Sequence, residues 1–307
     1  MFFTILTIIA VAIFFLNYTK KNISISNTDF PENDLKNESD VKSEKKPIEP
    51  DSITKKHLSS INKQYGIIGK PLGHSLSKSY FNEMFKNNAI KAEYLAFELE
   101  DIDQFVNLVK EYPKLSGVNV TIPFKETIIP YLDKIDDAAH SIGAVNVVKI
   151  VRTDEKTELH GYNTDTLGFM DSISPFIKPE IHKALILGTG GASKAVYYSL
   201  KSKGVECKFV SRSANSKNLA YYELSPSIME EFLIIVNCTP VGMFPNIDEC
   251  PPIPYAYVSS EHILYDLIYN PKKTLFLKKG QKRGAIIKNG YEMWKLQADA
   301  SWKIWNE

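Results

Sequence analysis

A run of small residues at positions 188–193, GTGGAS, has the composition of a phosphate-binding turn. It follows the apolar run KALIL directly and precedes the helical pattern KAVYYSLKSKG, which we expect to be capped at Gly204. Glycines let a backbone approach a pyrophosphate closely, and the start of the next helix offers it unpaired N–H groups and a positive dipole. A glycine turn alone is as often structural as functional, so its context has to decide.

The residues after the next apolar run, ECKFV, bear on the choice of cofactor. NAD-binding proteins place an acidic residue about twenty positions after the glycine turn, where it binds the ribose 2′-hydroxyl. This chain instead has Ser211, Arg212 and Ser213 there, with Lys217 close behind. A guanidinium pairs with a 2′-phosphate, so the sequence favours NADP over NAD. The alternative is that Arg212 is only a solvated surface charge.

A second group of polar residues follows the apolar run GVNV. Asn119 and Thr121 are two positions apart and therefore face the same side of an extended chain. Pro123 fits the first turn of a helix, which predicts that Lys125 lies near a helix amino terminus. Helix dipoles disfavour a cation there, so this position is unusual for a simple surface lysine.

Two further sites are ambiguous on residue type alone. Ser75 and Ser77 lie in a predicted turn where both hydroxyls can point the same way, but a serine before a helix is more often an N-cap. Asp165 ends the triplet Asn-Thr-Asp, which is commonly a cap for a helix such as TLGFMDSI. Capping and ligand binding can coexist at Asp165.

The elements that must position these residues begin at Tyr65. Short apolar runs then alternate with helical periodicity, which predicts an α/β fold with parallel strands in two blocks. The first block contains YGIIG, EYLAFEL and GVNVTIP, with amphipathic stretches at 77–88 and 102–111. The second contains KALIL, ECKFV, FLIIVNCTP, HILYDLIY and GAIIKNG, and a final helix is expected over 291–306.

Several motifs occur in a fixed order along residues 65–306. They are GKPLGHSLSKSYFN, GVNVTIPFKE, GAVNV, GYNTDTLGF, NCTPVGM, YDLIYNP and NGYEMWKLQA. In that order and at these separations they resemble the shikimate dehydrogenase family. The resemblance implies an α/β substrate-binding domain, a Rossmann-like NADP-binding domain, and NADPH-dependent reduction of 3-dehydroshikimate to shikimate.

Composition and the resemblance together divide the chain into five parts. We expect a hydrophobic segment at 1–19, a disordered linker at 20–62, a substrate-binding catalytic domain at 63–164, a Rossmann-like NADP-binding domain at 165–285, and a C-terminal helix at 286–307 that returns to the substrate domain.

The resemblance also implies roles for single residues. Lys125 is expected to be the principal acid/base with Asp165 as its partner, because a carboxylate beside an ammonium can relay a proton and stabilise a developing alkoxide. Tyr269 is expected near the substrate carboxylate, together with the two serines of the first turn. The positions expected to bind substrate are Ser75, Ser77, Asn119, Thr121, Lys125, Asn146, Asp165, Tyr269 and Gln297.

A second set of positions is expected to bind NADP. These positions are Gly188, Thr189, Gly190, Gly191, Ala192, Ser211, Arg212, Ser213, Lys217, Thr239, Leu267, Gly290 and Met293. For Leu267 and Met293 an ordinary role in the core is the alternative. Tyr291 and Trp294 are bulkier than the leucines associated with the motif, which leaves the local packing open.

The bulk composition excludes some functions. A net charge of +1 and a pI near 7.6 provide no basic field for binding nucleic acid. The three cysteines, Cys207, Cys238 and Cys250, are widely spaced and show no metal-ligand pattern, which favours a reducing compartment and no structural metal. Monomer and homodimer both remain open.

The amino terminus carries a separate signal. Residues 1–16 are uncharged and apolar and are followed by Lys20 and Lys21, which predicts a short membrane anchor over about residues 1–17 with the rest of the chain in the cytoplasm. A misassigned start codon is the alternative. Residues 22–62 are polar and lack apolar periodicity, so we expect a flexible tether there.

Two other functions compete with the main prediction. One is a quinate/shikimate dehydrogenase, which often uses NAD; Arg212 argues against the NAD form. The other is a non-catalytic, membrane-tethered ligand sensor on the same fold. Retention of both Lys125 and Asp165 argues against a sensor, because a pure binder needs no proton relay.

Overall fold

The computed structural model describes residues 61–73, 75–216 and 218–307, all within a compact unit that spans Asp51–Glu307. The expected anchor, nearly all of the expected linker, and Lys217 lie outside the described residues. Ile61 is buried and the Asn62 N–H donates to the Lys91 carbonyl at 3.0 Å. The folded unit therefore includes the last two residues that were assigned to the linker.

The first sheet has six strands in the order β2-β1-β3-β5-β6-β4. In chain order the strands are β1 (Lys63–Gly69), β2 (Ala92–Glu98), β3 (Leu115–Val120), β4 (Lys134–Ile135), β5 (Val147–Arg152) and β6 (Thr157–Tyr162). β1 pairs in parallel with β2 and β3, as predicted, but β5 is antiparallel to both β3 and β6. A tight turn at residues 153–156 joins β5 to β6, and so short a connection can join only antiparallel strands.

The second sheet is parallel throughout, in the order β12-β11-β10-β7-β8-β9. Its strands are β7 (Lys183–Leu187), β8 (Glu206–Ser211), β9 (Asn218–Ala220), β10 (Ile234–Asn237), β11 (Ile263–Asp266) and β12 (Ile286–Lys288). The chain winds outward from β7 in one direction and from β10 in the other. Ligands bind such doubly wound sheets at the carboxyl ends of the two strands where the winding reverses.

Eight α-helices accompany the sheets in the described part of the chain. They are α3 (Ser77–Asn87), α4 (Gln104–Glu111), α5 (Asp137–Ile142), α6 (Asp165–Ile173), α7 (Gly191–Ser202), α8 (Pro226–Glu231), α9 (Leu275–Lys282) and α10 (Tyr291–Asn306). The helices predicted at 77–88, 102–111 and 291–306 are confirmed as α3, α4 and α10. β12 belongs to the second sheet, so only the part of 286–307 from Tyr291 onward is the returning helix.

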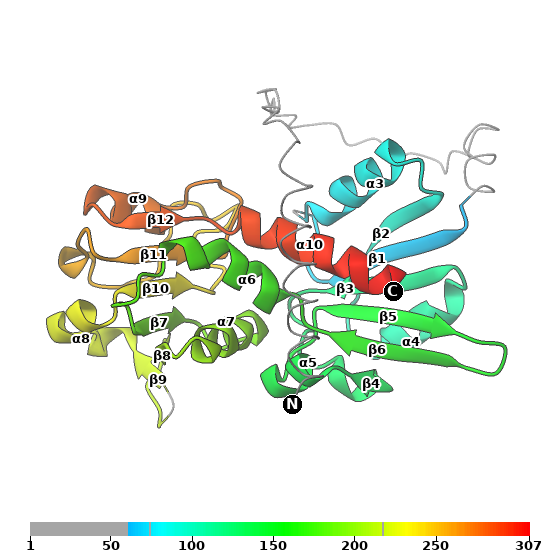
Figure 1. The fold of residues 1–307 in the computed structure, drawn as a ribbon, viewed down its shortest axis with the longest axis horizontal. Coiled ribbons are helices and arrows are strands. Elements are labelled where there is room, and N and C mark those ends of the chain that lie inside the picture. Colours follow the sequence, from blue (N-terminus) through cyan, green and yellow to red (C-terminus); the bar gives the residue numbers. More distant parts are fainter. Residues whose placement is uncertain (1–60, 74, 217) are drawn as a thin grey trace, which may run out of the picture. The chain divides into compact units, whose positions relative to one another are not determined.

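Helix α10 connects the two sheets (Figure 1). Its carboxyl end is held on the first sheet by Trp305, which is 3% exposed and donates from Nε1 to the Val148 carbonyl at 3.1 Å. Burying a side chain of this size contributes on the order of 3 kcal/mol. Near its amino end, α10 crosses α6 so closely that a Cβ at Gly168 would lie 2.5 Å from the Met293 carbonyl oxygen. Only glycine at 168 permits this crossing.

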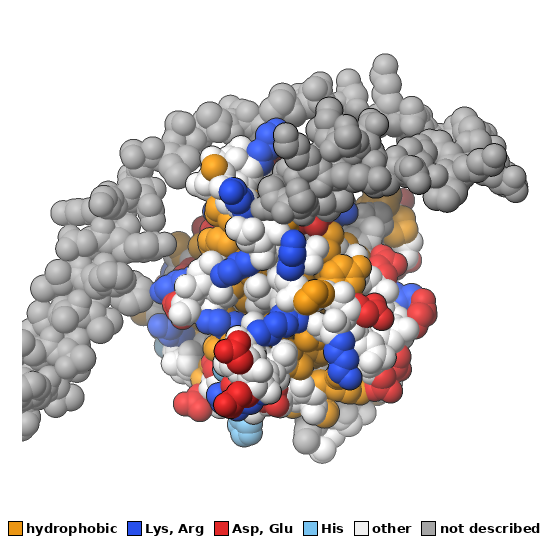
Figure 2. Space-filling model, turned by 90° about the vertical axis from the view of Figure 1, so that its right-hand side faces the viewer, with side chains coloured by type: hydrophobic (Ala, Val, Ile, Leu, Met, Phe, Trp, Pro, Cys, Tyr) orange, Lys and Arg blue, Asp and Glu red, His pale blue; other side chains and the backbone are white. Residues whose placement is uncertain are grey.

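The surface at the end of the first sheet carries both signs of charge (Figure 2). In the part of the chain that the structure describes, no helix is long and apolar enough to cross a membrane. Cys207, Cys238 and Cys250 are free thiols. Within the described ranges, no cluster of His, Cys, Asp and Glu is arranged to hold a metal ion.

Candidate active site

A pocket of about 460 Å³ lies where the ends of β1 and β3 face the ends of β10 and β11. This volume suits a small organic ligand. Every position that the sequence predicted to bind substrate lines it: Ser75, Ser77, Asn119, Thr121, Lys125, Asn146, Asp165, Tyr269 and Gln297. The structure therefore brings together residues that are more than two hundred positions apart in the chain.

Lys125 and Asp165 form an ion pair at the floor of this pocket. The Lys125 Nζ atom lies 2.6 Å from Asp165 Oδ2, and the two side chains are only 15% and 7% exposed. Asn146 Nδ2 donates to the other carboxylate oxygen, Oδ1, at 2.8 Å. Both oxygens of Asp165 are thus engaged, which fixes the carboxylate and leaves the ammonium beside the open volume. An ammonium held in this way can deliver a proton to a ligand oxygen.

The backbone around Lys125 differs from the prediction. Residues 122–128 form consecutive turns, and no α-helix starts at Pro123. In a helix the Lys125 carbonyl would accept from the Ile129 N–H. Instead it accepts from the Val145 N–H at 2.7 Å, and the Ile129 N–H donates to Glu126. The segment is thereby tied to residues 144–146, which brings Lys125 next to Asn146.

Asp165 begins α6 but does not cap it through its side chain. Its own N–H donates to Asn163 Oδ1 at 3.1 Å, so the preceding asparagine supplies the local turn. A carboxylate in the first helical turn is stabilised by the helix dipole. The Asp165 side chain therefore does not cap α6, and it contacts Lys125 and Asn146 instead.

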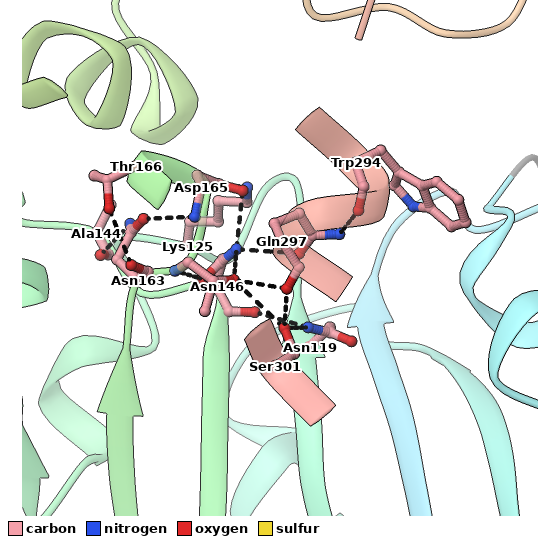
Figure 3. A network of polar contacts seen from close by, with 11 residues as sticks. Asn119, Lys125, Ala144, Asn146, Asn163, Asp165, Thr166, Trp294, Gln297 and Ser301 are labelled. Atoms are coloured by element: carbon pink, nitrogen blue, oxygen red, sulfur yellow. Dashed lines mark hydrogen bonds and ion pairs between the residues drawn. The ribbon is translucent and has the colours of Figure 1, made fainter. Parts of the chain in front are cut away.

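Asn146 occupies the centre of a polar network (Figure 3). Besides Asp165, its Nδ2 lies 3.1 Å from Thr164 Oγ1 and 3.4 Å from Gln297 Oε1, while its Oδ1 accepts from the Thr164 N–H at 2.8 Å. Gln297 comes from α10 and Thr164 immediately precedes α6. The close crossing of these two helices is what sets Gln297 beside the Lys125–Asp165 pair.

Ser75, Ser77 and Tyr269 lie together on another wall of the pocket. Ser77 is the first residue of α3 and is buried, and its N–H donates to Ser75 Oγ at 3.3 Å, so the Ser75 hydroxyl accepts from the first N–H group of the helix. Burial raises the pKa of the Tyr269 phenol, which meets the backbone of Leu76. The turn at 75–77 supplies two hydroxyl groups and Tyr269 supplies a third, a composition suited to a ligand carboxylate.

The glycine turn after β7 has the geometry that a pyrophosphate requires. Gly188 has a φ of +105°, a conformation that side chains disfavour. Gly190 is the N-cap of α7 and makes no side-chain hydrogen bond to the first N–H groups of this helix. β7 is also a strand where the winding of the sheet reverses, which is where dinucleotides bind in doubly wound folds. The residues present therefore fit a dinucleotide phosphate.

The predicted cofactor positions fall into two groups. Lining the pocket are Ala192, Thr239, Leu267, Gly290 and Met293. Outside its lining, along the carboxyl ends of β7 and β8, are Gly188, Thr189, Gly190, Gly191, Ser211, Arg212 and Ser213. Arg212 is exposed, as a group that meets a 2′-phosphate from solvent has to be. Met293 is 6% exposed and packs in the core while it also lines the pocket, so the core role is confirmed and a contact with the cofactor stays a prediction.

The bulky Trp294 is accommodated in an aromatic cluster at the pocket wall. Its ring centroid lies 5.2 Å from that of Tyr80, 5.8 Å from Tyr269 and 5.7 Å from Tyr291. Trp294 is 8% exposed and lines the pocket. The departure from the usual motif therefore adds an aromatic wall next to Tyr269.

Sequence reasoning missed polar residues that bond to the pocket side chains or their backbone, among them Tyr94, Asn163, Thr164 and Ser301. Tyr94 Oη donates to Asn119 Oδ1 at 2.7 Å, and Asn119 Nδ2 donates to Ser301 Oγ at 2.9 Å. Ser301 stands four positions after Gln297, on the same face of α10, and that spacing is a signal that could have revealed it. Nothing in the sequence around Tyr94 distinguishes it from a core aromatic residue.

Comparison with known proteins agrees with this geometry. Residues 67–148 match the family model described as the shikimate dehydrogenase substrate binding domain. A protein of Methanococcus aeolicus named shikimate dehydrogenase (NADP(+)) is 37% identical over 265 residues, which cover 81% of this chain and 93% of that protein.

Solved structures show the same relationship. A shikimate dehydrogenase from Aquifex aeolicus superposes with a TM-score of 0.69 at 36% identity, covering 80% of this chain and 92% of that one. The Thermus thermophilus shikimate 5-dehydrogenase, solved with NADP(H) and shikimate, gives a TM-score of 0.69 at 27% identity, with 79% and 93% covered. The chain belongs to the shikimate dehydrogenase family.

Proposed function

We propose that this protein catalyses the reversible, NADPH-dependent reduction of 3-dehydroshikimate to shikimate. The observation that carries the proposal is the buried Lys125–Asp165 pair, which lines the same pocket as Leu267 after β11 and Gly290 and Met293 at the start of α10. Its relatives are named for this reaction and for this cofactor. A proton source and a set of cofactor-binding residues in one small cavity are what a carbonyl reduction requires.

In the proposed reaction each group has one task. Bound NADPH supplies a hydride to the ketone carbon. Lys125 donates a proton to the ketone oxygen, so that the carbonyl becomes a hydroxyl and the positive charge on Lys125 is lost. Asp165 holds the ammonium at 2.6 Å and stabilises its charged form before transfer. In the oxidative direction the lysine accepts the proton back.

The remaining pocket residues bind the substrate in this proposal. Ser75, Ser77 and Tyr269 hold its carboxylate, while Gln297 and Asn119 contact ring hydroxyls. Such contacts fix the ketone relative to Lys125, and positioning of this kind contributes strongly to rate. In this proposal residues 63–164 form the substrate-binding domain, and residues 165–285 together with β12 form the NADP-binding domain.

Arg212 and Lys217 bind the 2′-phosphate in the proposed cofactor complex. The supporting observation is that Arg212 follows the carboxyl end of β8, next to the glycine turn in the sheet, and no acidic residue stands there. A guanidinium pairs well with a phosphate dianion. NADPH is therefore the expected reductant in preference to NADH.

We also propose that residues 1–19 tether the enzyme to the cytoplasmic face of a membrane and that residues 20–60 act as a linker. The support is the uncharged apolar run followed by two lysines. The tether would change where the enzyme works and leave its chemistry unaltered.

A turnover assay tests the central proposal. The full chain is mixed with dehydroshikimate and NADPH, and the loss of NADPH absorbance is followed. Parallel arms contain shikimate or quinate, each with NAD⁺ or NADP⁺. Turnover only in the dehydroshikimate and shikimate arms supports the proposal. Comparable turnover of quinate indicates the broader quinate/shikimate enzyme, and binding of shikimate without turnover in any arm indicates a sensor.

A further inference from the structure

Asn119 has its side chain engaged on both sides before any ligand binds. It is 6% exposed and lines the pocket. Tyr94 Oη lies 2.7 Å from its Oδ1, and Ser301 Oγ lies 2.9 Å from its Nδ2. Tyr94 and Ser301 are both fully buried. Figure 3 shows Ser301 reaching from α10 toward Asn119, below Asn146 and Gln297.

The directions of the hydrogen bonds around Asn119 can be assigned from neighbouring groups that can only donate or only accept. Ser301 Oγ lies 2.7 Å from the Gln297 carbonyl oxygen, which can only accept, so the single hydroxyl hydrogen of Ser301 is used there. Toward Asn119 the Ser301 oxygen is therefore an acceptor. Asn119 must then present an N–H group to it, and this assigns Nδ2 to the side of α10.

The other half of the Asn119 amide is assigned by Tyr94. With Nδ2 facing Ser301, Oδ1 faces the phenol and requires a donor. Burial holds the pKa of Tyr94 well above its usual range, so the phenol keeps its proton and supplies that donor. The second hydrogen of Nδ2 points toward the Asn146 carbonyl at 3.4 Å, a long contact that leaves it available to a ligand.

We infer that Ser301 and Tyr94 are positioning residues that lock the Asn119 amide in one orientation, with Nδ2 on the side of α10, so that a ligand oxygen next to Nδ2 is recognised as an acceptor. This rests on the proposed function, because the ligand group concerned is taken to be a ring hydroxyl of shikimate or 3-dehydroshikimate. Without Ser301 the amide can rotate by half a turn and offer its carbonyl oxygen instead.

The test compares Ser301 with Ser199, a second buried serine whose hydroxyl also donates to the backbone carbonyl four residues earlier. Ser199 in α7 donates to the Ala195 carbonyl at 2.8 Å, four positions earlier, as Ser301 does to Gln297. It is equally buried and does not line the pocket. Ser301→Ala in the full chain should raise the KM for dehydroshikimate about tenfold, the effect of one lost hydrogen bond, with kcat and the KM for NADPH changing less. Ser199→Ala should leave all three constants near wild type.

A double-mutant cycle distinguishes an effect on the position of the Asn119 amide from a general loss of structure in the variant. In an Asn119→Ala background, Ser301→Ala and Tyr94→Phe should add no further rise in KM, because they act only through Asn119. Wild-type enzyme should discriminate against the shikimate analogue that lacks the hydroxyl facing Asn119, and Ser301→Ala should lose that discrimination. If Ser301→Ala fails to fold, Tyr94→Phe is subjected to the same cycle.

Two results would overturn the inference: an undiminished effect of Ser301→Ala in the Asn119→Ala background, or an equal effect of Ser199→Ala. If wild-type protein neither binds shikimate nor turns over, the proposed function fails while the inference is still decided by NMR. The side-chain amide signal of Asn119, assigned by its loss in Asn119→Ala, should exchange its hydrogens with water faster in Ser301→Ala than in Ser199→Ala. Equal exchange in the two variants contradicts the locking of the amide.

Discussion

Gly191 approaches Lys125 so closely that a Cβ atom at position 191 would lie 3.1 Å from the Cβ of the lysine. The same Cβ would lie 3.3 Å from that of Ala144. The glycine turn that the sequence assigned to the cofactor therefore also packs on the stem of the proposed catalytic lysine. The backbone segment proposed to bind the cofactor phosphate therefore also helps to place the proposed proton donor.

Gly191→Ala should consequently reduce kcat. The added methyl group must displace the Lys125 stem by a few tenths of an ångström, and small misplacements of a catalytic group are costly, so we expect a fall of roughly 3- to 30-fold. Gly190→Ala is the contrast, since a Cβ there meets no atom within 4 Å. It should alter the KM for NADPH and leave kcat near wild type. A Gly191→Ala enzyme with full kcat would show that the contact does not position Lys125.

Lys125→Ala should lower kcat by about two to four orders of magnitude, the usual range for loss of a positioned acid/base. The KM for dehydroshikimate should change less. Lys110→Ala, which removes an exposed lysine of α4, serves as the control and should have no effect. Steady-state kinetics of the purified variants provide the measurement. If Lys125→Ala retains more than about a tenth of wild-type kcat, this lysine is not the proton donor.

Arg212→Ala should raise the KM for NADPH far more than the KM for NADH, because only NADPH carries the phosphate that the guanidinium can bind. Lys208→Ala removes a nearby cation from β8, the strand that Arg212 follows. The Lys208 ammonium lies 5.2 Å from the centroid of the Phe232 ring. Lys208→Ala should leave the ratio of the KM for NADPH to the KM for NADH as it is in wild type. Equal effects of Arg212→Ala on the two cofactors would falsify the assignment of Arg212 to the phosphate.

Asp266 should make the stability of the second sheet depend on pH. It is fully buried at the end of β11 and accepts hydrogen bonds from Asn237 Nδ2, the Ile268 N–H and Thr274 Oγ1. Burial nevertheless raises the pKa of this carboxyl from its ordinary value of 3.8 to about 7. A pKa raised in the folded state means that folding favours the protonated form. Stability is then greatest below the unfolded pKa and declines as pH rises toward the folded one.

The measurement is urea unfolding of wild type and Asp266→Asn at several pH values. Relative to the variant, wild type should lose roughly 3 kcal/mol between about pH 5 and pH 8, because each unit of pKa shift corresponds to about 1.4 kcal/mol. Other titrating groups cancel in this difference. A difference that stays constant across the range would mean that Asp266 is ionised throughout.

Much of the architecture could be predicted from local patterns. The glycine turn, the parallel strands around it and the long final helix follow from periodicity within short windows, and the structure confirms them. The helix predicted at Pro123 was wrong because the Lys125 carbonyl bonds to Val145, twenty residues away. The bond from Asn119 to Ser301 spans 182 positions and leaves no local trace. Residues that touch a ligand carry motif signals, whereas residues that orient them are fixed by tertiary contacts.

Truncation tests whether the amino-terminal segment contributes to the fold or the activity of the enzyme. A variant that begins at Ser60 retains Ile61, which is 5% exposed, and Lys114 donates to the Ile61 carbonyl at 2.7 Å. This variant should fold and keep wild-type kcat and KM, because every residue of the proposed site lies beyond the cut. Loss of folding would mean that residues 1–59 contribute to the catalytic unit.

Cell fractionation of the full chain should place it in the membrane fraction, since an uncharged apolar run followed by Lys20 and Lys21 is expected to insert with its basic flank in the cytoplasm. So short a run gives marginal insertion, so replacement of Ile8 and Ile9 by lysine should release the protein. Lys55→Ala and Lys56→Ala, in the linker, should leave its location unchanged. Protein of complete mass found only in the soluble fraction would refute the anchor, and a shorter product beginning near residue 60 would instead indicate processing or a later start.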